Sequence, residues 1–96
     1  MNKEKITKAL KNGNIEWRRH ALERMLERDI SRSEVKITLE NGKIIENYEN
    51  DAPFASALFF YIDSKPIHVV ASLDESTNTI YIITACVPNI THFYED

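Results

Sequence analysis

The sequence predicts an α+β fold in which two to three N-terminal helices pack on an antiparallel, four-stranded meander sheet. Apolar residues recur at helical spacing as far as Asn41, and β-rich runs separated by short polar connectors follow Gly42. The chain has 96 residues, of which 43% are apolar, which suits a single hydrophobic core. We therefore expect one domain with its helices first and its sheet after them.

Three helices are expected before Gly42. The first covers residues 2–12 and ends at Gly13, a residue that readily adopts the left-handed conformation of a helix C-terminus. The second runs from residue 18 or 19 to about 28, with apolar side chains along one stripe and charged ones on the other side. The segment Ser31-Arg32-Ser33-Glu34 fits a capping box, so a third helix should begin there and stop at Asn41-Gly42.

Four strands are expected after the helices. Short polar connectors favour antiparallel neighbours, so a meander is the simplest topology. Alternation in the first strand would place Ile44, Glu46 and Tyr48 on one face. Before the second helix, Ile15–Trp17 is either a brief strand or an extended lead-in. The four expected strands are Lys43–Glu49, Phe54–Ile62, Ile67–Leu73 and Thr79–Val87.

Charge is distributed unevenly along the chain. Residues 1–30 hold eight Lys or Arg and five Asp or Glu, a sum of +3, whereas residues 31–96 hold four and ten, a sum of −6, which together give −3. No apolar run approaches the roughly 20 residues of a membrane span, and residues 1–11 lack the apolar centre of a signal peptide. A single cysteine, Cys86, agrees with a reducing compartment. We expect a cytoplasmic protein without a membrane partner.

The second helix carries a set of residues suited to phosphate. His20, Arg24 and Arg28 are each four apart, so they lie along one ridge and can meet one ligand. Guanidinium groups bind phosphate oxygens with two parallel hydrogen bonds, and an imidazole transfers protons near neutral pH. The alternative is an ordinary solvated face, in which Glu23 and Glu27 pair with the neighbouring arginines.

His68 interrupts a strongly apolar strand. If the last connector brings Leu73 opposite Thr79, His68 lies across from Thr84, with Cys86 one step away on the same face. A cysteine beside a histidine is a candidate thiolate nucleophile in an electropositive, partly exposed setting. The alternatives are a hydrogen-bonded core histidine and a small buried cysteine.

The sequence lacks the usual motifs for a metal ion or a nucleotide cofactor. His20 and Glu23 are spaced to share an ion, but no cysteine pair or second close histidine completes the site. Gly13 and Gly42 are the only glycines, and both are placed as helix caps, so no glycine-rich phosphate loop is present. We expect no metal and no cofactor.

Four motifs follow one another along the chain. They are His20-Ala21-x-x-Arg24-Met25-x-x-Arg28-x-Ile30-Ser31, Gly42-Lys43-Ile44-Ile45, Pro66-Ile67-His68-Val69-Val70 and Ile83-Thr84-x-x-x-Pro88. In this order they resemble a known bacterial family, domain-of-unknown-function family 4258. The resemblance runs from about Trp17 to Pro88, which divides the single domain 1–96 into a helical extension at 1–13, a family-like core at 14–88 and a tail at 89–96.

The helix-then-sheet order of that family resembles the RelE and ParE toxin superfamily, and its members often lie beside small antitoxins, some with a YgiT-type zinc finger. The resemblance implies a toxin of a toxin–antitoxin pair: a metal-independent endoribonuclease acting on mRNA, either free or ribosome-associated, with a small antitoxin as its partner. At position 86, similar members often have tyrosine. The polar residues that match the family motifs are His20, Arg24, Arg28, His68 and Thr84. We assign His20, Arg24, Arg28 and His68 to catalysis, and Arg19, Tyr61, Tyr81, Thr84 and Cys86 to substrate binding.

In this hypothesis His20 or His68 acts as the acid or base, Arg24 with Arg28 holds the phosphate, and Tyr61 or Tyr81 stacks on a base. The competing hypothesis is a non-catalytic module that binds a protein or nucleic acid through the same ridge, or a homodimer formed through a sheet edge. The acidic second half of the chain and the cysteine at position 86 favour this alternative.

Overall fold

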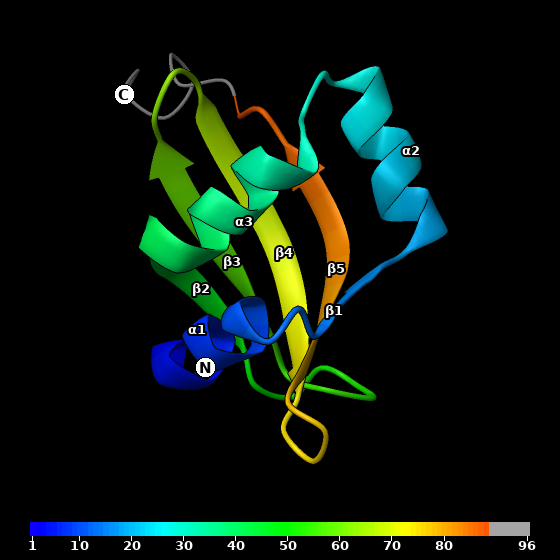
Figure 1. Cartoon of the computed structure of the whole chain (residues 1–96), viewed down its shortest axis with the longest axis vertical. Coiled ribbons are helices and arrows are strands. Elements are labelled where there is room, and N and C mark those ends of the chain that lie inside the picture. The colour runs from blue at the N-terminus through cyan, green and yellow to red at the C-terminus, as the bar shows by residue number, and fades with distance from the viewer. Residues whose placement is uncertain (89–96) are drawn as a thin grey trace.

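The computed structural model describes residues 1–88, in which three helices pack on a five-stranded sheet (Figure 1). The α+β class is confirmed, and the expected tail at 89–96 lies outside the described residues. None of the helices within the described part of the chain is long and apolar enough to cross a membrane. The elements are α1 (Lys3–Lys11), β1 (Ile15–Trp17), α2 (Arg19–Glu27), α3 (Arg32–Asn41), β2 (Lys43–Tyr48), β3 (Ser56–Ile62), β4 (Pro66–Asp74) and β5 (Thr79–Cys86).

The sheet is mixed, with the strand order β1-β5-β4-β3-β2. Strands β2 to β5 form the predicted antiparallel meander, but β1 joins it as a fifth strand, parallel to β5, with Ile15 opposite Ile80. The prediction of a purely antiparallel, four-stranded sheet was therefore wrong. The sequence of β1 indicates only that its three residues are extended. It does not identify their hydrogen-bonding partners, because these lie much later in the chain, in β5.

The helix ends follow local chemistry. Asn2 caps α1 by accepting a hydrogen bond of 2.8 Å from the Glu4 amide. Gly13 follows α1 in the left-handed region, with φ +71°. At α3 the predicted capping box is present: the Ser31 hydroxyl accepts from the Glu34 amide at 3.0 Å, and the Glu34 carboxylate accepts from the Ser31 amide at 2.9 Å.

Gly42 ends α3 for a different reason from Gly13. Its backbone is extended, with φ −75°, so no left-handed conformation is involved. A methyl group at this position would lie 2.7 Å from the Phe60 carbonyl oxygen and closer still to the Thr38 carbonyl oxygen. The absence of a side chain at Gly42 therefore lets the end of α3 pass directly over β3.

The hydrophobic core lies between the sheet and the helices. Helices α1 and α3 cover one face of the sheet, and α2 lies along the β5 side (Figure 1). Ile6 and Ala9 of α1 are fully buried, so the N-terminal extension is packed into the core. Lys3 adds a polar contact: its ammonium donates to the carbonyls of Leu39, Glu40 and Gly42 at 2.7, 3.1 and 3.1 Å. A cation at this position satisfies carbonyls that the C-terminus of α3 leaves without helical partners.

Two irregularities change the predicted strand faces. In β2 the register shifts between Ile44 and Glu46, so Ile44 packs on the core opposite Phe59, whereas Glu46 lies on the opposite face. The predicted sharing of one face by these two residues was wrong, because the bulge at Ile45 adds a residue.

The register of the β4–β5 hairpin also differs from the prediction. Leu73 pairs with Ile80 instead of Thr79, and a bulge at Ile83 then makes His68 pair with Cys86 instead of Thr84. Thr84 lies opposite Val70, two residues from His68 along β4. The three polar residues still share one face of the sheet, as expected, although the exact pairing was wrong. Within residues 1–88 no helix packs on this face, which we call the face without helices (Figure 1).

Replacing either glycine by alanine tests the two different roles. We expect Gly42→Ala to lower the free energy of unfolding by about 3 kcal/mol, because its new methyl group meets two backbone oxygens that cannot move independently. Gly13→Ala should cost about 1 kcal/mol, since no atom lies within 4 Å and only the left-handed backbone is strained. Urea denaturation followed by circular dichroism measures both, and an equal loss for the two variants would contradict the close-approach explanation.

Candidate functional site

Strand β5 has two different neighbours along its outer side. Its first part, Ile80–Ile82, pairs with β1. Within residues 1–88, the second part, Ile83–Cys86, has no strand on that side, and α2 lies there instead, packed on β5 through the buried side chains of Ala21 and Met25 (Figure 1). The sheet therefore has a stretch of edge that has no strand neighbour within residues 1–88, with α2 beside it, and we call this stretch the free edge of β5.

Arg28 joins α2 to this edge. Its Nη1 atom donates a hydrogen bond of 2.9 Å to the Ala85 carbonyl oxygen. Ala85 stands between Thr84 and Cys86, so one end of the predicted ridge meets β5 at the predicted substrate-binding residues. The contact leaves the other N–H groups of the guanidinium for a further partner.

The remaining ridge residues contact one another. The Nε of Arg24 donates to the Nε2 of His20 at 3.3 Å, and the same guanidinium forms an ion pair with Glu27 at 3.4 Å. This ion pair is one that the solvated-face alternative expects. The helical repeat places residues 22 and 26 on the side of α2 opposite to this ridge. Leu26, on that side, lines a hollow next to α3. The ridge therefore faces away from α3, along the free edge of β5.

Arg19 is not part of this group. Its side chain is 91% exposed and forms an ion pair of 3.2 Å with Glu23 one turn further along α2. On the helix it points away from the buried stripe, so the structure does not bring it to the other predicted residues.

His68 lies on the face of the sheet that no helix of residues 1–88 covers, and pairs with Cys86. Its ring meets Phe60 edge-on, with the ring centres 5.1 Å apart. Burial lowers the pKa of the His68 imidazole below its ordinary value of 6.5, while the carboxylate of Glu46 acts in the opposite direction. The imidazole is therefore mainly neutral near pH 7, the form that accepts a proton.

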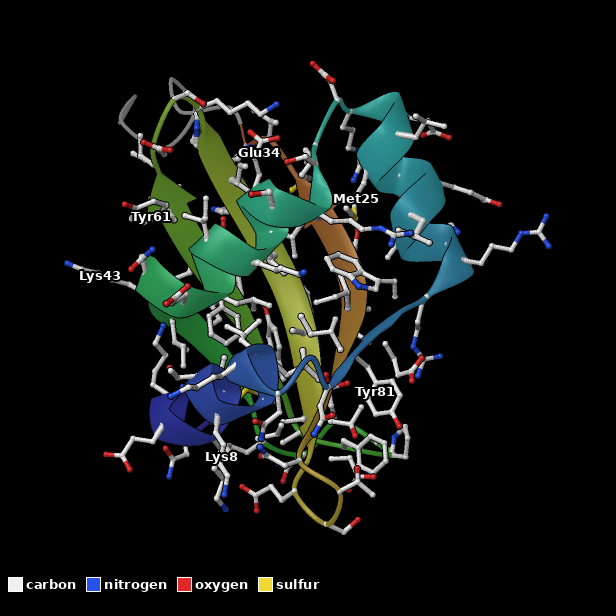
Figure 2. All side chains as sticks on the ribbon, viewed as in Figure 1. Lys8, Met25, Glu34, Lys43, Tyr61 and Tyr81 are labelled. Atoms are coloured by element: carbon white, nitrogen blue, oxygen red, sulfur yellow. The ribbon has the colours of Figure 1, made fainter. Side chains whose placement is uncertain are left out.

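The two predicted stacking tyrosines lie apart, at opposite corners of the molecule (Figure 2). Tyr61 lines a small hollow on the helix side, with Thr38 of α3, so the structure does not bring it to His68. Tyr81 is already stacked on Phe54, with ring centres 5.6 Å apart and an angle of 8° between the planes. The guanidinium carbon of Arg18 lies 5.6 Å from the centre of the Tyr81 ring.

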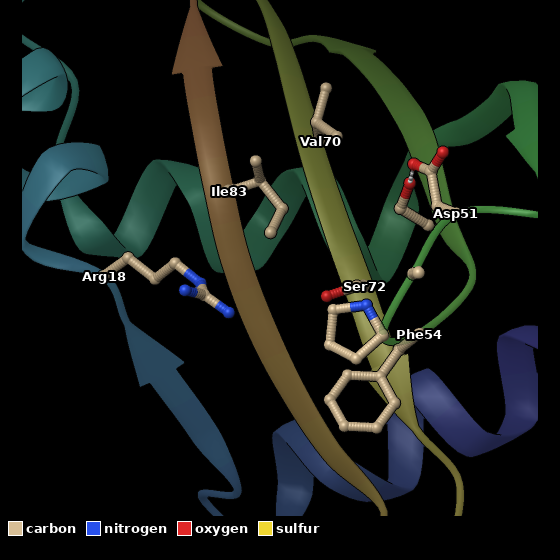
Figure 3. Close-up of a pocket in the computed structure, with 9 residues that line it drawn as sticks. Arg18, Asp51, Phe54, Val70, Ser72 and Ile83 are labelled. Atoms are coloured by element: carbon tan, nitrogen blue, oxygen red, sulfur yellow. Dashed lines mark hydrogen bonds between the residues drawn. The ribbon is translucent and has the colours of Figure 1, made fainter.

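Arg18 belongs to a groove that the sequence analysis missed. The groove has a volume of about 360 Å³ and lies across β3, β4 and β5 on the face without helices (Figure 3). Arg18 stands on one side and Asp51 on the other, above an apolar floor formed by Val70 and Ile83. The sequence analysis placed Arg18 only at the start of a helix. Its approach to the sheet depends on the pairing of β1 with β5. The other lining residues are Ala52, Pro53, Phe54, Ser56 and Ser72.

The geometry thus brings together one set of predicted residues and leaves others apart. Within residues 1–88 no three His, Cys, Asp or Glu side chains are grouped so that they could hold a metal ion. Arg28, Thr84, Cys86 and His68 gather at the free edge of β5, and His20 with Arg24 continues this group along α2.

Fold and site together define a class of protein: an α+β domain whose cationic helix ridge follows the free edge of β5 in a mixed sheet. The family model for the domain of unknown function DUF4258 matches residues 17–87, and the chain belongs to this family. No curated protein matches the sequence, and neither does any solved structure. The family match begins at the last residue of β1, so α1 precedes it.

The lowered pKa of His68 predicts a pH dependence of stability. Between the folded pKa and 6.5 the unfolded chain binds more protons than the folded one, so this contribution is complete above about pH 6.5. It is lost as the pH falls from there to the folded pKa. We expect the urea midpoint to decrease between about pH 7.5 and about pH 5, and to decrease less in His68→Gln.

An NMR titration of the His68 ring protons gives the pKa directly. Glu46→Gln should lower it further, because the raising effect of the carboxylate is removed. A pKa at or above 6.5 in the wild type would show that burial does not govern this histidine.

Proposed function

We propose that the protein is a RelE-like toxin, a metal-independent endoribonuclease that acts on mRNA in the cytoplasm and is held inactive by a small antitoxin protein. The observation that carries this proposal is the hydrogen bond from Arg28 to the Ala85 carbonyl, since it joins the cationic ridge of α2 to the strand segment that pairs with His68. The resemblance of the family to RelE and ParE toxins supports the same class of activity.

The neighbouring strands β4 and β5 lie about 5 Å apart, as in any sheet. His68 on one side of β5 and Arg28 on the other are therefore separated by little more than one strand. A phosphodiester laid across the free edge would meet arginines on the α2 side and an imidazole on the sheet side. This arrangement supplies both kinds of group that cleavage of RNA requires.

In the proposed reaction, neutral His68 takes the proton of the ribose 2′-hydroxyl, and the 2′-oxygen attacks the adjacent phosphorus. Arg24 and Arg28 bind the phosphate oxygens, where negative charge increases in the transition state. The bond from phosphorus to the 5′-oxygen breaks, and that oxygen takes a proton from water, while His20, whose Nε2 accepts the hydrogen bond from Arg24, holds this guanidinium in the ridge. The products are a 2′,3′-cyclic phosphate and a 5′-hydroxyl end.

Thr84 and Cys86 occupy the strand surface between these groups. The Thr84 hydroxyl is a hydrogen-bond donor for a phosphate or a ribose oxygen. Cys86 offers a small side chain next to His68, where a larger residue would fill the space, so we assign it a role in contact with substrate and none in proton transfer.

Cleavage of a fluorescent single-stranded RNA in the presence of EDTA tests the proposal. We expect His68→Gln to slow cleavage by about 100- to 10,000-fold, the usual contribution of a general base. Arg24→Ala should slow it by about 100-fold through the loss of charge stabilisation. Lys8→Ala is the control, because it removes a positive charge from exposed α1, far from α2 (Figure 2).

Wild-type protein that leaves RNA intact, or variants that cleave as fast as the wild type, would refute the enzyme. Tight RNA binding without cleavage would favour the binding-module alternative. Growth of bacteria that express the wild type or His68→Gln provides the same comparison inside cells, where only the wild type should arrest growth and degrade transcripts.

A further inference from the structure

The groove of Figure 3 has opposite charges on its two sides. Neither Arg18 nor Asp51 takes part in any of the ion pairs formed within residues 1–88. Instead the Arg18 guanidinium lies over the Tyr81 ring, and one oxygen of Asp51 accepts a hydrogen bond from the Ser56 hydroxyl. The groove therefore presents a cation and an anion that no ion pair of residues 1–88 neutralises.

The floor between the two charges is mainly apolar. Val70 and Ile83 supply side chains from adjacent strands (Figure 3). Pro53 also lines the groove. A flat aromatic ring laid on this floor would have aliphatic contacts below it and a charged group at each end. Stacking on a flat apolar surface combined with hydrogen bonds at the ring edge is how proteins read unpaired RNA bases.

The groove is continuous with the proposed cleavage site. Val70, which forms part of its floor, pairs with Thr84, and Ile83 is the next residue along β5. A chain of nucleotides crossing the free edge of β5 at Thr84 would therefore place a neighbouring base over Val70 and Ile83. Arg18, directly before α2, lies over Tyr81 at the β5 side of the groove (Figure 3) and would meet a phosphate of that nucleotide.

We infer that the groove between Arg18 and Asp51 is a base-specific subsite for one nucleotide of single-stranded RNA, and that it selects guanine. Guanine offers two adjacent donors, N1–H and N2–H, which match the two oxygens of a carboxylate. Uracil offers one donor between two carbonyl oxygens, and these oxygens would repel the Asp51 carboxylate. Adenine and cytosine offer one amino group each, so we expect their affinities for the groove to lie between those of guanine and uracil.

This inference extends the proposed ribonuclease by naming the base that it recognises, and it is tested separately by NMR titration of the full chain with 5′-GMP, 5′-UMP and inorganic phosphate. We expect GMP to shift the methyl signals of Val70 and Ile83 and the amide of Ser72, and to bind about tenfold more tightly than UMP. Phosphate alone should not move the two methyl groups.

Two variants separate the ends of the groove. Asp51→Asn should abolish the preference for GMP over UMP, because an amide replaces the carboxylate that accepts both hydrogen bonds. Arg18→Ala should weaken both nucleotides to a similar extent through the phosphate. Asp63→Asn is the control for Asp51, since it removes an exposed carboxylate from the β3–β4 turn on the other side of the sheet.

Equal binding of GMP and UMP, a preference that survives in Asp51→Asn, or methyl shifts produced by phosphate alone would overturn the inference. Mapping of RNA ends distinguishes it from the proposed function. Cleavage by the wild type with no guanine preference would refute the subsite and leave the ribonuclease standing. Selective binding of GMP by a protein that never cleaves RNA would support the subsite and refute the ribonuclease.

Discussion

Strand β5 changes its outer neighbour halfway along its length, from β1 to α2. The candidate site depends on which group donates hydrogen bonds to the β5 backbone where β1 ends. A buried carbonyl without a hydrogen-bond partner is costly, so a strand that loses its neighbour needs another donor. Arg28 supplies that donor to Ala85. The same guanidinium that completes the backbone hydrogen bonding thereby ties the C-terminal end of the α2 ridge to β5, while the pairing of β4 and β1 with β5 places His68 and Arg18.

The sequence predicted those features that local chemistry determines. The capping box at Ser31 and Glu34, the left-handed Gly13 and the four strands of the meander are each encoded by residues close to one another, and all were found. The parallel pairing of Ile15 with Ile80 was not predicted, because a three-residue strand carries too little pattern to identify a distant partner. The role of Gly42 was likewise hidden, since it depends on how closely α3 crosses β3.

The candidate site could be predicted where the helix or strand repeat decides which side chains share a face. Spacing placed His20, Arg24 and Arg28 on one ridge, and alternation placed His68 and Cys86 on one face of the sheet. The face was right although the pairing was wrong, because the hairpin turn and the bulge at Ile83 each shift the register by one residue and together restore the alternation. The groove could not be predicted, because Arg18 and Asp51 are brought together only by the completed sheet.

The long reach of the contacts around β5 also determines when the site forms. The two residues of the Arg28–Ala85 hydrogen bond are 57 positions apart. The pairing of β1 likewise requires β5, which is made much later. Contacts between distant parts of a chain close slowly and late in folding. During translation, α2 and its arginines are made long before the strand that they meet. A nascent chain therefore carries the ridge without the strand that it contacts, and any activity that needs both begins only after Cys86 has been added and β5 has joined the sheet.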